Sequence, residues 1–222
     1  MIARLGTCTV DGTGKIVTFV NGIQRVPGFD PSWQGLGTPL NPGLQMVIGG
    51  KVARIQTVNS PTTMTLASSI GAMPSPVPFL PNRETLYQAL FNLVSQAPGL
   101  VTWSRRTMLP QNVDGSDQPA LFMDQRGENP ERQGQGIPYM WRLEAELKIY
   151  CYSGDTSIPP ATLLNPILDA IEAMFPPQIA ALVPQTFGGL CVEARLQGDG
   201  KGEAGTIGNQ AVAFVPVMIL AI

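Results

Sequence analysis

The alternation of apolar and polar residues divides this 222-residue chain into two parts. Over residues 1–72 the pattern is that of strands, with a β-branched run at 15–21 and two further runs on either side of Gly49-Gly50. Because a Gly-Gly pair supplies the positive φ angles of a two-residue hairpin turn, residues 44–58 are predicted to form a β-hairpin. No helical period occurs in this part. We therefore expect a small β module of the sandwich or barrel type.

A proline-rich segment follows this module. Residues 73–82 contain four prolines in ten positions, which favours an extended polyproline geometry and excludes a helix. Net charge changes sign at the same place: residues 1–80 carry five basic and two acidic side chains, whereas residues 81–222 carry nine basic and fourteen acidic ones. We interpret 73–82 as a semi-rigid linker between two domains, 1–72 and 83–222.

The second domain mixes two periods. Apolar residues at helical spacing after Asn82, a residue suited to capping, predict a helix over 83–97, and a second helix is predicted over 161–175. Strict alternation predicts a long strand over 139–152. The other strands are predicted at 100–108, 119–125, 190–197 and 211–222. The fold class that follows is α+β: a small all-β N-terminal domain, then an antiparallel sheet with two helices packed on one face.

One side of the predicted strand 139–152 is charged. Arg142, Glu144, Glu146 and Lys148 alternate in sign along it. Two carboxylates on one face could perform acid–base chemistry. The alternation of sign instead favours a charge ladder that pairs across strands and faces solvent or another subunit.

Two polar segments, 124–138 and 198–209, are expected to be loops between strands. Loops on a rigid sheet often carry binding residues, so we expect both segments to contact other subunits or other components of an assembly. The side chains that we assign to such an interface are Arg126, Glu128, Glu131, Arg132, Glu144, Glu146, Lys201 and Glu203.

The amino-acid composition and the motifs argue against several kinds of catalytic, metal and cofactor site. The sequence contains no histidine, which excludes imidazole-dependent nucleophilic catalysis and histidine-ligated metals. Cys8, Cys151 and Cys191 have no zinc-type spacing and are expected to be buried thiols. The G-x-G-x-x-G run at 200–205 precedes a predicted strand, whereas a dinucleotide site needs a helix at that point. We therefore predict no enzyme, and neither a cofactor nor a metal.

Charge and hydropathy also restrict the partners. Charged residues make up 14% of the chain and its net charge is −2, against about 25% charged residues in typical soluble domains. This balance argues against sequence-specific nucleic-acid binding, and so little surface charge is easier to explain in an oligomer. The longest apolar run, 211–222, is too short to cross a bilayer, and no signal peptide follows Met1. We expect assembly in the cytoplasm, without a membrane.

Several short runs carry a resemblance to a known family. In the second domain they are Arg83-x-x-Leu-Tyr-x-Ala-Leu-Phe-x-Leu93, Trp103-Ser-Arg-Arg106, Gln118-Pro-Ala-Leu-Phe-Met123, Leu164-Asn-Pro-Ile-Leu-Asp-Ala-Ile171 and Gln185-Thr-Phe-Gly-Gly-Leu190. With the alternating strand, they make residues 83–222 resemble the tail terminator or tail-completion proteins of tailed bacteriophages and related neck connector proteins. The first domain is similar to β modules of phage virion proteins at Pro42-Gly43, Ile48-Gly-Gly-Lys51 and Thr63-Met-Thr-Leu66.

The resemblance implies a structural virion protein at the head–tail junction, made in the host cytoplasm. Such a protein forms a homo-oligomeric ring, typically a hexamer, at the head-proximal end of the tail. It would stop polymerisation of the tail tube and join the tail to the neck and head. Its partners would be other neck and tail proteins, and DNA would pass through the ring lumen without being read.

One alternative remains open at the level of sequence, a host-surface carbohydrate-binding or adhesion module of a virion. Phe19, Phe29 and Trp33 could stack on a sugar, although such aromatics usually form the core of a small β module. The mass of the particle separates the two hypotheses. A ring supports the connector, and glycan binding by a monomer supports the adhesion module.

Overall fold

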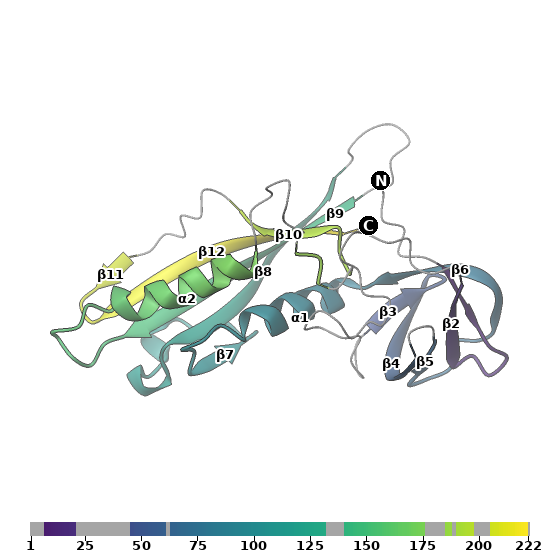
Figure 1. Cartoon of the computed structure of the whole chain (residues 1–222), viewed down its shortest axis with the longest axis horizontal. Coiled ribbons are helices and arrows are strands. Elements are labelled where there is room, and N and C mark those ends of the chain that lie inside the picture. Colours follow the sequence, from purple (N-terminus) through teal and green to yellow (C-terminus); the bar gives the residue numbers. More distant parts are fainter. Residues whose placement is uncertain are drawn as a thin grey trace.

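The structure is a computed structural model, and it describes residues 7–20, 45–60, 63–131, 140–175, 185–187, 190–197 and 205–221. Within these ranges the fold is α+β, as the sequence predicts. The molecule is elongated, with a β-barrel at one end and a twisted sheet with two helices over the rest of its length (Figure 1).

The barrel is closed, and its strands follow the order β1-β2-β5-β4-β3-β6. They are β1 (Thr7–Val10), β2 (Ile16–Val20), β3 (Gln45–Ile48), β4 (Lys51–Ser60), β5 (Thr63–Leu66) and β6 (Met73–Pro81). The predicted hairpin is confirmed: β3 pairs with β4 around Gly49 and Gly50, whose φ angles are 54° and 80°. Alternate side chains, such as Met46, Ile48 and Met64, fill the interior.

The prediction of a linker at 73–82 is wrong. Residues Met73–Pro81 form β6, which closes the barrel by pairing with β1 on one side and β3 on the other. The segment is extended, as its prolines require, but it is part of the barrel. The β1–β6 register shifts between Cys8 and Val10, so that β6 carries extra residues, including Pro74 and Pro76, opposite one position of β1. A bulge of this kind tolerates prolines, which cannot donate to the strand ladder.

The second sheet has the order β10-β12-β9-β8-β7, with β11 also paired to β12. Its strands are β7 (Thr102–Ser104), β8 (Ala120–Glu131), β9 (Met140–Tyr152), β10 (Glu193–Leu196), β11 (Gly205–Ile207) and β12 (Gln210–Ala221). All pairs are antiparallel except β7 with β8, which is parallel. The three longest strands, β12, β9 and β8, form the centre, and Leu143, Leu147, Ile149, Val215 and Ile219 are buried there as expected.

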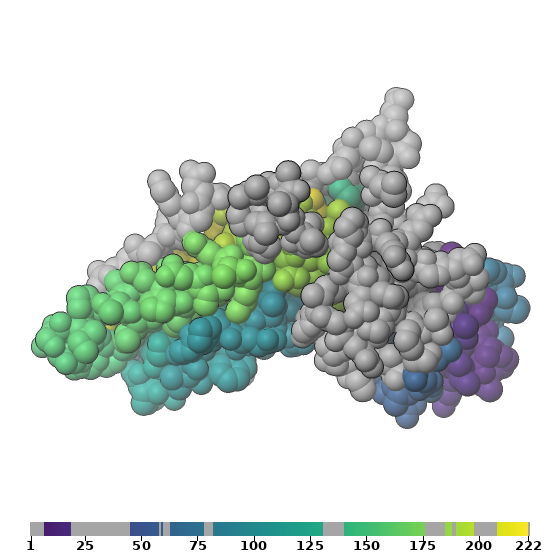
Figure 2. Space-filling view, in the orientation of Figure 1, coloured from purple at the N-terminus to yellow at the C-terminus, as the bar shows by residue number. Residues whose placement is uncertain are grey.

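Both helices cover one face of this sheet (Figure 1). They are α1 (Arg83–Val94) and α2 (Ala161–Met174), and they lie side by side in the space-filling view (Figure 2). Asn82 caps α1 as predicted, because its Oδ1 accepts the backbone N–H of Thr85 at 2.8 Å. Two short 3-10 turns, Pro110–Asn112 and Gly115–Asp117, lie between β7 and β8.

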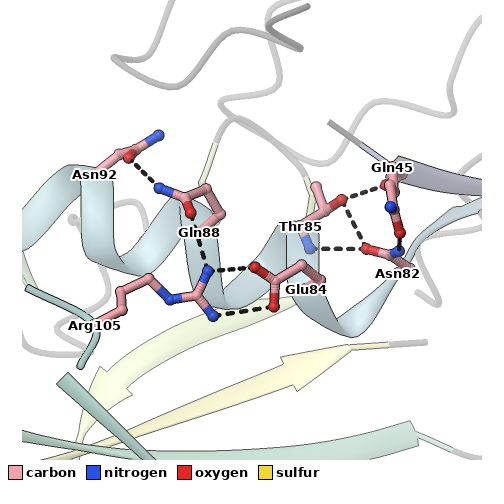
Figure 3. Close-up of polar contacts among 7 residues, drawn as sticks. All are labelled: Gln45, Asn82, Glu84, Thr85, Gln88, Asn92 and Arg105. Carbon is pink, nitrogen blue, oxygen red and sulfur yellow. Dashed lines mark hydrogen bonds and ion pairs between the residues drawn. The ribbon is translucent and has the colours of Figure 1, made fainter. Parts of the chain in front are cut away.

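The barrel and the helical part share one core. A single apolar cluster runs from Cys8 and Val10 of the barrel through Leu86 and Leu90 of α1 to the sheet. Polar contacts reinforce the junction (Figure 3): Asn82 donates from Nδ2 to Oε1 of Gln45 at 2.9 Å, and the Thr85 hydroxyl donates to the Gln45 carbonyl. The two predicted domains therefore pack as one unit.

Three predicted boundaries change in the structure. The strand expected at 100–108 is only the three residues of β7. The loop expected over 124–138 is a strand as far as Glu131, because β8 continues to pair with β9 past its polar residues. In the expected loop 198–209, residues Gly205–Ile207 form β11 and turn at Gly208 into β12. Residues 132–138 and 198–204 of these segments lie outside the described residues.

Candidate functional site: the helix-free face of the sheet

Both α-helices in the described part of the chain lie on one face of the sheet, and neither covers the other face, which we call the helix-free face. Side chains alternate along β9, so that Leu143, Leu147 and Ile149 point to the helices. Arg142, Glu144, Glu146 and Lys148 therefore point to the opposite face, where each is half-buried. This arrangement confirms the predicted separation of an apolar and a charged side of the strand.

The charges on this face pair mainly between β8 and β9. Lys148 Nζ lies 3.2 Å from Oδ2 of Asp124, and Arg126 forms a close ion pair with Glu146. The β8–β9 register shifts between Gln125 and Gly127, so Arg126 is the extra residue of a bulge. Among the side chains of these two strands that the structure describes, three acidic and three basic ones lie on this face, and their charges sum to zero: Asp124, Glu144, Glu146, Arg126, Arg142 and Lys148.

Next to the charged row lies an apolar one. Val212, Phe214 and Pro216 of β12 are half-buried on the same face, and Phe214 pairs across the strands with Lys148. The sequence contains no charged residue after Glu203. The helix-free face thus combines a neutralised charge ladder with an uncharged strip.

Glu128 does not belong to this face. Its Oε2 lies 2.7 Å from Nη1 of Arg83, at the start of α1, and the Arg83 guanidinium lies 4.6 Å from the centre of the Trp141 ring. The bulge at Arg126 explains the difference, because it moves the residues after it to the other side of the strand. Glu128 therefore ties β8 to α1, and the prediction that it faces a partner is not supported by this pairing.

The remaining interface predictions fall at the edge of the described chain. Glu131 ends β8 and pairs with Met140, and only its backbone is described. Arg132, Lys201 and Glu203 lie outside the described residues. The same holds for Phe29 and Trp33 of the sugar-stacking alternative, and only the backbone of Phe19 is described.

A polar row along α1 is a feature that the sequence analysis missed (Figure 3). Arg105 makes two hydrogen bonds to the Glu84 carboxylate and one, at 3.0 Å, to Oε1 of Gln88. Gln88 in turn donates from Nε2 to Oδ1 of Asn92 at 2.7 Å. The four-residue spacing of Glu84, Gln88 and Asn92 is the signal that could have found it. This row joins α1 to the end of β7 and is structural.

Burial raises the pKa of several titratable groups in the interior. Cys8, Cys151 and Cys191 are free and buried, and burial raises the pKa of Cys8 to about 11 and that of Cys151 to about 12. Thiols of this kind are protonated near neutral pH and are poor nucleophiles. Burial, and then the charge of Glu128, raise the pKa of Tyr87 to about 12. Among the described residues, no cluster of carboxylates and thiols could hold a metal ion.

The comparisons with known proteins do not assign the chain to a family. No protein-family model matches the sequence, and no curated protein is significantly similar to it. In the described part of the chain, no helix is long and apolar enough to cross a membrane.

Proposed function

We propose that the protein is a non-catalytic structural subunit of a tailed-bacteriophage virion. It forms a homo-oligomeric ring, typically of six copies, at the head-proximal end of the tail. The ring ends the tail tube and joins it to the neck, so that its further partners are neck and tail proteins. It is made in the host cytoplasm, and DNA passes through its lumen without sequence-specific contacts.

The observation that carries this proposal is the helix-free face of the sheet. It places half-buried apolar side chains such as Phe214 beside a ladder whose charges cancel. A neutral, partly apolar face of this kind suits a protein partner and lacks the positive charge that nucleic-acid binding needs. The resemblance of residues 83–222 to tail terminators supports the same class of function.

Electron microscopy and mass measurement of the purified full-length chain test the proposal. We expect ring-shaped particles whose mass is a small multiple of the 23.7 kDa chain, and labelling of the chain in virions at the head–tail junction. A protein that stays monomeric at high concentration and binds glycans would overturn the proposal and support the adhesion module.

A further inference from the structure

The end of the molecule opposite the barrel is built from three segments, which we call the tip: residues 107–118, 152–158 and 208–210. Ser153 donates its backbone N–H to the Asn209 carbonyl at 2.9 Å, and Gln210 donates from Nε2 to the Pro110 carbonyl at 3.4 Å. A Cβ atom at Gly115 would lie 2.5 Å from the Tyr152 ring, so the loop packs directly against that ring. Figure 1 shows these segments and the barrel at opposite ends of the long axis.

The tip exposes apolar side chains. Met108, Leu109, Tyr152 and Ile158 are 41%, 57%, 40% and 43% exposed. Large exposed apolar side chains that gather at one end of a molecule, with charges around them, are typical of a protein contact surface. Tyr150, buried beneath, donates its hydroxyl to the Met108 carbonyl at 3.0 Å and holds this part of the surface in place.

The charges around these side chains have one sign. The tip contains Asp114, Asp117 and Asp155, all exposed, and no lysine or arginine, so three acidic and no basic side chains give −3. The sequence has no basic residue between Arg106 and Arg126, nor between Lys148 and Arg195. The acidic charges of the tip are therefore not compensated by any basic side chain within the tip.

The barrel has the complementary character. Ile16 and Val52 are 43% and 62% exposed on its surface. Lys15 precedes Ile16, Lys51 precedes Val52 and Arg54 follows two positions later, and all three basic residues are exposed, although Lys51 Nζ also donates to the Ile70 carbonyl at 2.7 Å. Among the described residues, none of these three basic side chains forms an ion pair.

The one acidic residue in the described part of the barrel, Asp11, offsets only part of this basic charge, since three basic side chains and one acidic side chain give +2. Asp11 uses its carboxylate within its own turn, where Oδ1 accepts the backbone N–H of Ile16 at 3.0 Å and the Thr13 hydroxyl at 2.7 Å. Over residues 1–80 as a whole, five basic and two acidic side chains give +3.

We propose that the tip of one copy docks on the barrel surface of a second copy, with Asp114 and Asp117 facing Lys15, Lys51 and Arg54 around an apolar centre. Opposite charges around apolar side chains steer two surfaces together and select the pairing. The two surfaces lie at opposite ends of one chain and cannot meet within it. Each copy offers one of each, so the contact is head-to-tail and closes into a ring or continues as a stack. This inference rests on the proposed function and names the surfaces through which the subunits meet.

Chemical cross-linking of the full-length protein tests the contact directly. A water-soluble carbodiimide joins a carboxylate to an amine only when the two touch. In a mixture of isotope-labelled and unlabelled chains, we expect intermolecular amide bonds from Asp114 or Asp117 to Lys15 or Lys51. Asp169 and Glu172, exposed on α2, provide the background. Links from these two residues at the same frequency as from the tip would overturn the proposal.

Charge reversal provides the second measurement. The double variant Asp114→Lys, Asp117→Lys should raise the protein concentration needed for half-assembly about tenfold, and so should Lys15→Glu, Arg54→Glu. Combining all four substitutions restores complementary charge and should restore assembly. The variant Asp169→Lys, Glu172→Lys makes the same charge change outside the tip and should assemble like the natural protein. Circular dichroism checks that each variant is folded.

The outcomes separate this proposal from the function on which it rests. If the natural protein forms rings and reversal at the tip has no more effect than reversal on α2, the tip–barrel contact is wrong and the structural function stands. If the natural protein remains monomeric at every concentration and salt, both are wrong. Weaker association at high salt is a further expected result, because salt screens exposed charges.

Discussion

Single residues in the centre of the sheet determine how well it packs. Leu147 of β9 is fully buried and lies between β8 and β12, opposite Met123 and Val215. Its side chain belongs to the apolar cluster that also contains the buried residues of both helices. Removing atoms at such a site leaves a cavity that the surrounding strands cannot close, because they are held in register on both sides.

We expect Leu147→Ala to lower the free energy of unfolding by ~2–5 kcal/mol, the range for fully buried leucines. Chemical denaturation of the full-length chain measures the change. Leu163→Ala is the matched control, since Leu163 is 37% exposed on α2 and its truncation should have a much smaller effect. Equal effects of the two substitutions would contradict the position of Leu147 in the core.

Asp11 makes a pH-dependent contribution to the barrel. Backbone and hydroxyl donors, first Ile16 and then Thr13, lower the pKa of its carboxyl below the ordinary value. A group whose pKa is lowered by folding stabilises the protein above its unfolded pKa, and this stabilisation is lost as pH falls through the folded value. The carboxylate therefore favours the folded barrel at neutral pH and ceases to do so in acid.

We expect Asp11→Asn to lower the melting temperature at pH 7, with a difference from the natural protein that shrinks as pH falls below about 4, the ordinary pKa of an aspartate. Thermal unfolding over a pH series measures it. Thr13→Ala removes one donor to the same carboxylate and should reduce the pH-dependent difference. A difference that stays constant with pH would show that the charge of Asp11 has no role.

At the scale of elements, Asn82 has two functions. It caps α1 through Oδ1, and it joins that helix to β3 through the hydrogen bond from its Nδ2 to Gln45. Tyr87, one turn further on, reaches the carbonyls of Gly127 and Glu144 with its hydroxyl at 3.5 and 3.4 Å. The first turns of α1 are thus held to both the barrel and the sheet.

Two substitutions separate the functions of Asn82. Asn82→Ala should cost about 1 kcal/mol for the lost cap, together with the bond to Gln45. Asn82→Ser keeps an oxygen that can cap the helix but loses the bond to Gln45, so we expect an intermediate free energy of unfolding. Denaturant titration of both variants provides the comparison. If serine and alanine are equally destabilising, the cap is not the main contribution.

At the scale of the whole molecule, the continuous core decides how the chain unfolds. Buried residues of the barrel and of the α+β part belong to one apolar cluster, and β6 leads into α1 with only Asn82 between them. Two units that share so much apolar contact lose it together when either one opens.

We therefore expect one cooperative unfolding transition, with the same midpoint for a probe in the barrel and a probe in the sheet. Limited proteolysis should release no stable fragment that begins near Asn82. A fragment 83–222 expressed alone should be less stable than the full chain, because α1 would lose its contacts with β3, including the hydrogen bond from Thr85 to Gln45. Two separate transitions would show that the parts fold independently.

The sequence predicted the elements whose periodicity is strong. Helices α1 and α2, strand β9 with its charged and apolar sides, and the hairpin at Gly49-Gly50 agree with their patterns, because each depends on neighbours a few residues away. Charge composition and the lack of histidine were likewise properties of the sequence alone. They excluded imidazole chemistry without any knowledge of the fold.

Only the tertiary structure decided what depends on distant partners. The prolines of 73–81 indicate an extended segment in either case, and pairing with β1 and β3 makes that segment a barrel strand. The bulge at Arg126 sends Glu128 to Arg83 and leaves Arg126 with Glu146, a difference that no alternation pattern contains. The tip follows the same rule, since Asp114 and Asp155 are far apart in sequence and gather at one end only because the pairing of β8 with β9 brings their loops together. Local periodicity determines elements, whereas strand pairing over long separations determines which side chains form a surface.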